Sequence, residues 1–211
     1  MRTLYVVTHP EATHHVEGRV GGWYDSELTA KGLKAADRIG AALTARIPRT
    51  ETIELYSSDL RRTTQTTAAI STHLGTLPVF DARLREKSYG IAEGKPQAWL
   101  DERFRTPPPV GERLRHDEGI DGAETMHAFA TRIYEFMGEI LERTCSHQII
   151  STHGGVLTFA AAAFLRLPID ALGHMRLRAR PGTITVLRED DYFHNRSLIE
   201  LSATPEWGLS V

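Results

Sequence analysis

The sequence predicts an α/β protein, a three-layer sandwich with a mostly parallel central sheet flanked by helices. Short apolar runs alternate along the chain with stretches in which apolar residues recur at helical spacing, which is typical of β-α units. Two of the apolar runs, residues 4–8 and 148–152, are each followed by a histidine, His9 and His153. Because the carboxyl ends of strands form the ligand-binding edge of such sheets, we expect both histidines at one site.

The composition is that of one globular domain over residues 1–211, with no internal repeat and no linker that would separate domains. The chain is 41% hydrophobic and 25% charged, which is enough for a sizeable core. A net charge of -2 gives no indication of nucleic-acid or membrane binding. The single cysteine, Cys145, leaves no intrachain disulfide and is compatible with a reducing cytoplasm. We expect neither a signal peptide nor a membrane span, because no apolar run is long enough.

The first half of the chain begins with a buried strand that Pro10 ends, since proline has no N–H to give to a neighbouring strand. A polar, glycine-rich loop follows over residues 11–27, and its length predicts a functional loop. Thr29 is a good N-cap for the next helix, which Pro48 ends. The elements expected next are a strand over 53–56, a helix from Asp59 to Leu74 and a short strand over 79–80.

Residues 81–121 lose this periodicity, and we interpret them as an irregular cap over the site with one or two short helices. A helix over 126–141 keeps a 3.6-residue period, and the strand that ends at His153 follows it. Residues 156–165 are nearly all apolar and predict a buried helix. The chain closes with strands over 183–187 and 197–201, joined by a turn at Asp190 and Asp191.

The residues at the predicted sheet edge suit phosphoryl transfer through a covalent intermediate. Such chemistry needs a nucleophile, cations around the phosphoryl oxygens and an acid for the leaving group. His9 could be the nucleophile, and His153 and Arg62 could hold the oxygens. Glu86, in the cap, could protonate the leaving oxygen, with Glu93 as the alternative donor.

Ten histidines raise the question of a metal site, but their spacing argues against one. No two histidines stand four residues apart on one predicted helix, so we expect neither a metal nor a cofactor. His15 is equally compatible with a solvated loop residue and with a phosphate ligand. Surface positions are expected for His14, His73, His116, His127, His147, His174 and His194.

Several ordered motifs, spread over nearly the whole chain, resemble those of the histidine phosphatase superfamily, which includes phosphoglycerate mutases and many small-molecule phosphatases. The resemblance implies a phosphoglycerate mutase-like sandwich in a single domain, with a phosphohistidine at His9. It also implies phosphate contacts from Arg62 and His153 and a proton donor at Glu86. The motifs are Thr8-His9-Pro10-Glu11, Val16-Glu17-Gly18-Arg19, Gly22-Trp23-Tyr24-Asp25, Leu28-Thr29 with Gly32, Ser57-Ser58-Asp59-Leu60-Arg61-Arg62 with Gln65-Thr66, Leu84-Arg85-Glu86, Tyr89-Gly90, Glu93-Gly94, Gly122-Ala123-Glu124-Thr125 with Arg132, and Ser151-Thr152-His153-Gly154-Gly155-Val156.

The chain departs from the family where the phosphate ligands are expected. The family usually opens with Arg-His-Gly, whereas Thr8 and Pro10 flank His9 here. A bidentate ligand has become a hydroxyl, and one backbone donor is gone. His15 stands where the family commonly places a phosphate-binding Asn. The candidate substrate-binding residues are Thr8, His15, Arg19, Gly22 and Gly154.

These observations favour a phosphomonoester hydrolase that acts on a small-molecule phosphate. A phosphoglycerate-type mutase is the first alternative, although residues 94–122 form a shorter segment than the matching insert of those mutases. The second alternative is a degenerate or recruited member that binds a ligand, or runs another reaction, because Thr8 and His15 replace the usual ligands. The expected partner is a small phosphorylated molecule, not nucleic acid or a membrane, and a homodimer is left open.

Overall fold

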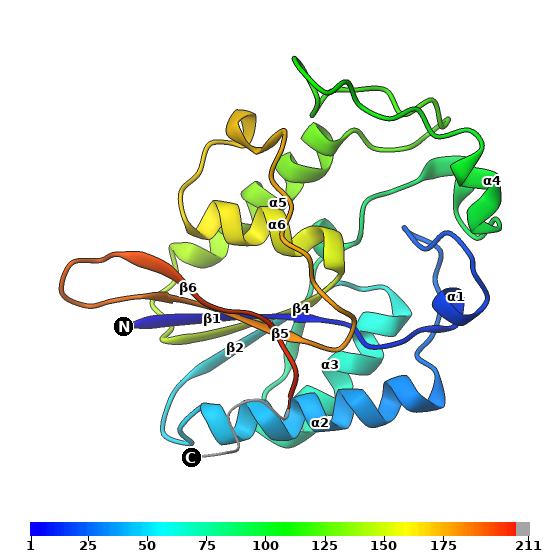
Figure 1. Cartoon of the computed structure of the whole chain (residues 1–211). Helices are drawn as coiled ribbons and strands as arrows, with labels where there is room; N and C mark the ends of the chain where they lie inside the picture. Colours follow the sequence, from blue (N-terminus) through cyan, green and yellow to red (C-terminus); the bar gives the residue numbers. More distant parts are fainter. Residues whose placement is uncertain (206–211) are drawn as a thin grey trace.

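A six-stranded sheet forms the middle layer of the computed structural model, which describes residues 1–205 (Figure 1). The four strands β3, β2, β4 and β1 run parallel, β5 pairs antiparallel with β1, and β6 pairs antiparallel with β5. The sheet is therefore mixed, and the predicted α/β sandwich is confirmed. The strands are β1 (Arg2–Thr8), β2 (Ile53–Ser57), β3 (Pro78–Phe80), β4 (His147–Thr152), β5 (Ile184–Glu189) and β6 (Arg196–Ala203), in the spatial order β3-β2-β4-β1-β5-β6.

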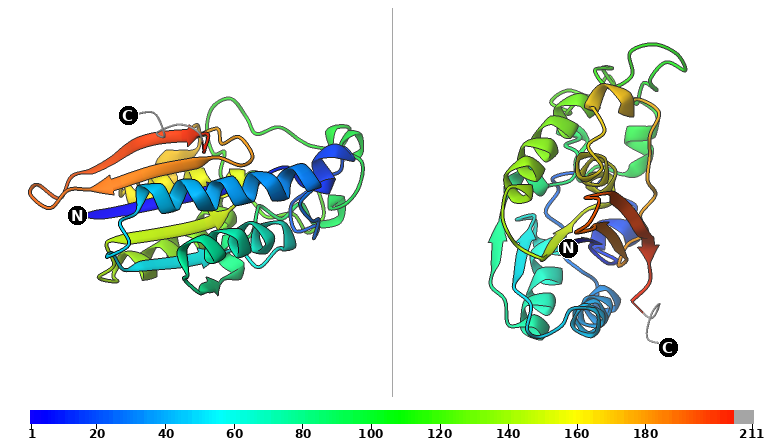
Figure 2. Two further views of the ribbon diagram at one scale, coloured as in Figure 1. Left: turned by 90° about the horizontal axis from the view of Figure 1, so that it is seen from below. Right: turned by 90° about the vertical axis from the view of Figure 1, so that its left-hand side faces the viewer.

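Two long helices cover each face of the sheet. In Figure 1, α5 (Met126–Leu141) and α6 (Gly154–Phe164) lie above it, and α2 (Ala30–Arg46) and α3 (Arg61–Leu74) lie below. Figure 2 shows the same three layers from two further sides. Within residues 1–205, no helix combines the length and the apolar character that a bilayer crossing requires.

The strand β1 is apolar on both sides because it is buried on both sides. Leu4 and Val6 pack into the cluster beneath α5 and α6, whereas Tyr5 and Val7 pack into the cluster above α2 and α3. Successive side chains of a strand point to opposite faces, so a central strand reads as a continuous apolar run. This burial fixes the position of the residues that follow β1.

The predicted boundaries agree with the structure at most helices but not at α3. Thr29 caps α2 as expected, since its hydroxyl accepts a hydrogen bond from the amide of Gly32 at 3.0 Å. The helix α3 begins at Arg61 rather than at Asp59. The amide of Arg61 donates to the carboxylate of Asp25 at 2.6 Å, so a loop side chain caps this helix. Asp59 instead pairs with Arg85 across the sheet edge.

The segment over residues 81–121 lies at the end of the molecule opposite the N-terminus, next to α1 (Thr13–Val16), as Figure 2 shows. It has an apolar cluster of its own, in which Val20 from the loop after β1 packs against Leu100 and Ile120. The loop and the cap segment are therefore packed together. The remaining short elements are η1 (Ala82–Leu84), η2 (Gly90–Ala92), α4 (Gln97–Asp101) and η3 (Ile169–Leu172).

Candidate active site

The histidines that follow β1 and β4 lie side by side at the carboxyl edge of the sheet. The two strands are parallel neighbours in register at Thr8 and Thr152, and the amide of His9 donates to the carbonyl of Thr152 at 2.9 Å. The ring of His153 stands edge-on to the ring of His9, with 5.1 Å between the centroids. The expectation that two distant strand ends bring these imidazoles together therefore agrees with the structure.

The partner of Nδ1 decides which nitrogen of His9 carries the proton. Nδ1 lies 2.8 Å from the carbonyl oxygen of Pro10, and because a carbonyl only accepts, the hydrogen is on Nδ1. Nε2 keeps its lone pair and accepts a hydrogen bond from Nε of Arg62 at 3.3 Å. Burial, with the charge of Arg62 as the second cause, holds the pKa of His9 well below its ordinary value of 6.5. The ring is neutral at pH 7, which is the nucleophilic form.

Arg62 is held at the first turn of α3 as a buried, oriented cation. Its side chain is 1% exposed, and burial lowers its pKa to about 10, which leaves it charged at neutral pH. Nη1 and Nη2 donate to the carbonyl oxygens of Tyr24 and Gly22 at 2.8 and 2.7 Å. Gly22 has a φ of +53°, a conformation that favours glycine, so this loop is shaped to meet the guanidinium.

Glu86 reaches the amino-terminal turn of α6, directly after His153. Its Oε2 accepts a hydrogen bond from the amide of Gly155 at 3.0 Å, which holds the carboxyl group two residues from His153. The backbone carbonyl of Glu86 is fixed as well, by Nε1 of Trp23 and by Nη2 of Arg132, both at 2.8 Å. Gly155 has no side chain because a Cβ there would overlap Oε1 of Glu86.

Two further histidines complete the cluster, and one of them corrects a prediction. His14 is 7% exposed rather than at the surface; its Nδ1 lies 2.6 Å from the hydroxyl of Ser26. Its ring lies 4.0 Å from that of His15, which in turn stacks on His9 at 5.5 Å with an angle of 10°. Burial is the largest cause that lowers the pKa of both, that of His14 to about 3. Nδ1 of His15 accepts the amide hydrogen of Ala12, so its neutral ring carries the proton on Nε2.

The structure engages two of the predicted binding residues elsewhere. The hydroxyl of Thr8 is buried and donates to the carbonyl oxygen of Arg180 at 2.7 Å, on the side of β5. The guanidinium of Arg19 donates to the carboxylate of Glu17 and to the carbonyl oxygen of Gly94. Gly154 lies where β4 turns into α6, and a Cβ there would touch nothing closer than 3.9 Å. Thr8 and Arg19 therefore have structural contacts in place of a phosphate contact.

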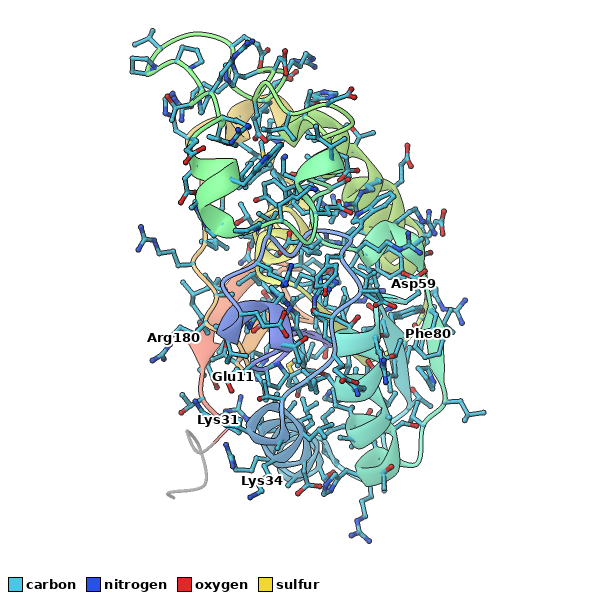
Figure 3. All side chains as sticks on the ribbon, turned by 90° about the vertical axis from the view of Figure 1, so that its right-hand side faces the viewer. Glu11, Lys31, Lys34, Asp59, Phe80 and Arg180 are labelled. Atoms are coloured by element: carbon cyan, nitrogen blue, oxygen red, sulfur yellow. The ribbon has the colours of Figure 1, made fainter. Side chains whose placement is uncertain are left out.

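A cavity of about 440 Å³ opens beside His15, on the α2 side of the cluster. Its wall includes Pro10, the residue after His9, and its rim carries charged groups of both signs. Figure 3 shows three of these, Glu11, Lys31 and Arg180, close together below and beside α1. Lys31 pairs with Glu11 at 3.1 Å. The cavity has room for a small organic group next to the histidine cluster.

The sequence did not reveal which residues hold the predicted site residues in place. Asp25 caps α3, Trp23 and Arg132 hold Glu86, and Ser58 contacts His153. All four belong to the quoted motifs, but a sequence motif does not show which atom each side chain contacts. For metals, no group of three or more His, Cys, Asp or Glu side chains within residues 1–205 is placed to hold an ion.

The sequence and the fold of this chain have known counterparts. The chain matches the family model "Histidine phosphatase superfamily (branch 1)" over residues 4–199, and it belongs to this superfamily. The resemblance stated from the motifs is thereby confirmed. The family and the relatives below indicate an enzyme of the histidine phosphatase type.

Relatives of both kinds, mutases and phosphatases, are similar to this chain. A "Probable phosphoglycerate mutase GpmB" of Salmonella paratyphi C is 32% identical over 182 residues, 84% of this chain and 81% of the relative. The solved Bacillus stearothermophilus YhfR has a TM-score of 0.74 and 26% identity, with 96% of this chain and 98% of that one covered. A mycobacterial glucosyl-3-phosphoglycerate phosphatase, solved with VO3, has a TM-score of 0.76 at 24% identity, with 96% and 100% covered, and this likeness supports the fold alone.

Proposed function

We propose that this protein is a phosphomonoester hydrolase that acts on a small-molecule phosphate through a phosphohistidine at His9. The observation that carries the proposal is the state of His9: a neutral ring whose Nε2 lone pair lies against the buried guanidinium of Arg62. A phosphoryl group that replaces this hydrogen bond at Nε2 meets the nucleophile and, beside it, the positive charge of Arg62.

In the first step, Nε2 of His9 attacks the phosphorus, and the bond from phosphorus to the leaving oxygen breaks. Glu86, protonated, gives its proton to that oxygen as the alcohol departs. The carbonyl of Pro10 accepts the hydrogen bond from the Nδ1–H of His9 and so stabilises the positive charge that develops on the ring. Arg62 and His153 hold the equatorial oxygens throughout.

In the second step, a water molecule attacks the phosphorus of phospho-His9. The Glu86 carboxylate takes a proton from this water, the bond from phosphorus to Nε2 breaks, and inorganic phosphate leaves. Both groups return to their starting state, so the cycle consumes water and ester and needs no metal or cofactor. The buried Cys145 thiol, which forms no disulfide, fits a reducing compartment such as the cytoplasm.

His15 supports activity despite the missing family ligands. Its Nε2–H is a donor at the position of the family's phosphate-binding Asn, so a neutral ring supplies the same kind of contact as an amide. The engaged hydroxyl of Thr8 supports the alternative, a recruited or degenerate pocket with one ligand fewer. We expect Thr8→Arg with Pro10→Gly to raise phosphate release if the pocket is only weakened. No gain, together with tight binding of an uncharged ligand, favours recruitment.

The 32% identity to a protein named as a probable phosphoglycerate mutase keeps the mutase as the second candidate. Incubation with 3-phosphoglycerate separates the two: a hydrolase releases glycerate and phosphate, and a mutase gives the isomeric phosphoglycerate. The shorter cap argues for the hydrolase, since a mutase must shield its phosphoenzyme from water.

The direct test is phosphate release from a broad panel of phosphomonoesters by the native protein and by His9→Ala. We expect turnover by the native protein and none above background by the variant. His194→Asn is the matched control: this exposed histidine lies in the β5–β6 turn at a φ of +55°, which asparagine tolerates. Equal activity of the native protein and His9→Ala would overturn the proposal.

A further inference from the structure

The ring of His153 has one nitrogen in contact with Ser58 and one nitrogen in contact with nothing. Oγ of Ser58 lies 2.9 Å from Nε2, and both residues are fully buried. Nδ1, the other nitrogen of the ring, is buried without a hydrogen-bond partner within residues 1–205. Because this ring lies against that of His9, its unpaired nitrogen is available to a group that binds beside His9.

The ring is neutral and so has a single N–H. Burial, followed by the charges of Arg62 and His9, holds the pKa of His153 well below its ordinary value of 6.5. The hydrogen is therefore on Nδ1 or on Nε2, and the two tautomers differ in whether Nδ1 is a donor or an acceptor. With the hydrogen on Nδ1 the site receives a donor, and with the hydrogen on Nε2 it receives a lone pair.

Counting unsatisfied groups separates the two tautomers. If Nδ1 carries the hydrogen, the Ser58 hydroxyl donates to Nε2, and only the Nδ1–H is left unpaired. If Nε2 carries it, Nε2 donates to Oγ, and two groups are left without partners: the Nδ1 lone pair and the Ser58 hydroxyl hydrogen. The oxygen of Ser58 already accepts from the amide of Leu60 at 3.4 Å, which also favours donation of its hydrogen to the ring. The first tautomer leaves fewer buried groups unsatisfied.

The backbone of Ser58 fixes this contact. Its amide donates to the carbonyl of Ser151 on β4 at 3.1 Å, and its carbonyl accepts from the hydroxyls of Ser57 and Thr63 at 2.7 and 3.1 Å. The hydroxyl is thus presented to His153 from the end of β2, next to the strand that carries the histidine.

We propose that Ser58 is a positioning residue: its hydroxyl donates to Nε2 of His153 and thereby keeps the proton on Nδ1, which donates to a phosphoryl oxygen at His9. The oxygens of a phosphoryl group are acceptors, so they are stabilised by an Nδ1–H and repelled by an Nδ1 lone pair. The role toward phosphate rests on the proposed function, whereas the tautomer does not.

The tautomer is measured by two-bond ¹H–¹⁵N spectra of protein labelled with ¹⁵N-histidine, without any turnover. The native protein and Ser58→Thr, which keeps the hydroxyl, are expected to show His153 protonated on Nδ1. Ser58→Ala removes the hydrogen bond that holds the lone pair on Nε2, so the tautomer protonated on Nε2 is expected to become populated. Ser151→Ala is the matched control, since the hydroxyl of Ser151 is buried near His153 and has no hydrogen-bond partner within residues 1–205; it should leave the tautomer unchanged.

Affinity for inorganic phosphate and kinetics with a phosphomonoester follow the same variants. Ser58→Ala is expected to lose on the order of 10- to 100-fold in phosphate affinity and in kcat/KM, as is typical when a supporting hydrogen bond is removed. Ser58→Thr is expected to recover most of both. An Nε2-protonated ring in the native protein, or the same tautomer in Ser58→Ala, overturns the proposal. A tautomer that shifts as expected in a protein without any hydrolysis overturns the proposed function instead, and leaves the assignment of Ser58 standing.

Discussion

Gly155→Ala is expected to remove most of the general-acid contribution to catalysis while α6 stays folded. An alanine Cβ would overlap Oε1 of Glu86 and lie 3.1 Å from the ring of Phe129. Because Phe129 is packed in the main core and the carboxylate is the end of a flexible side chain, the carboxylate is the group that moves. It then loses the amide of Gly155, its 3.0 Å partner at the helix terminus.

The size of the effect follows from the role of Glu86. A well-placed general acid contributes about 10²- to 10⁴-fold to rate, so kcat/KM for alkyl phosphates should fall by about this factor. At 1.4 kcal/mol per tenfold, the loss is about 3 to 5.5 kcal/mol of transition-state stabilisation. Aryl phosphates with a good leaving group need no proton, so their hydrolysis should fall much less.

The assay compares the two substrate types for the native protein, Gly155→Ala and Gly138→Ala. Gly138 lies in α5 with nothing within 4 Å of an added Cβ, so its replacement should raise stability by about 1 kcal/mol, or about 2–4 °C in Tm, without changing kcat/KM. An equal loss for alkyl and aryl phosphates in Gly155→Ala would refute the assignment of Glu86 as proton donor.

Three further outcomes are expected. The pKa of His14 is about 3 in the folded protein and near 6.5 in the unfolded chain, so the unfolded chain takes up this proton at a higher pH. The free energy of unfolding should therefore fall as the pH drops below 6.5, by up to about 1.4 kcal/mol per pH unit. Urea titrations between pH 7 and pH 5 should show a weaker dependence of this free energy on pH for His14→Gln. Arg62→Lys leaves two loop carbonyls without their donors, so it should lower the free energy of unfolding by about 2 kcal/mol and kcat/KM by about 100-fold. A free energy of unfolding within about 0.5 kcal/mol of that of the native protein, measured by chemical denaturation, contradicts this. Lys87→Met breaks a buried 2.6 Å ion pair with Glu118 and should lower the free energy of unfolding by about 3–5 kcal/mol. Combining it with Glu118→Leu should recover most of this loss. If the effects of the two single replacements simply add up in the double variant, the ion pair does not contribute as described.

The fold was readable from the sequence because its signals are local. The apolar run before Pro10, the cap at Thr29 and the period of 126–141 each act over a few residues, and each agrees with the structure. The start of α3 was misplaced because its cap, Asp25, is 36 residues away from Arg61 in the chain. A contact between distant residues leaves no periodic signal.

The sequence predicted only the site residues that lie at strand ends or within the family motifs. His9, His153 and Arg62 were placed together because two parallel strands and one helix terminus share an edge. The burial of His14 was missed, because a loop histidine carries no sign of whether a neighbouring ring will cover it. The contacts of Thr8 were missed for a related reason: its partner, the carbonyl of Arg180, is a backbone atom, and backbone acceptors are the same at every position.

The apolar cluster of the cap has an implication for how specificity can change in this protein. Val20, Leu100 and Ile120 bury themselves against one another rather than against the sheet. Substitutions that reshape this cluster should change the structure within the cap segment, while His9 and His153 stay fixed to the ends of β1 and β4. A library confined to residues 89–120 should therefore alter substrate preference more readily than it unfolds the protein.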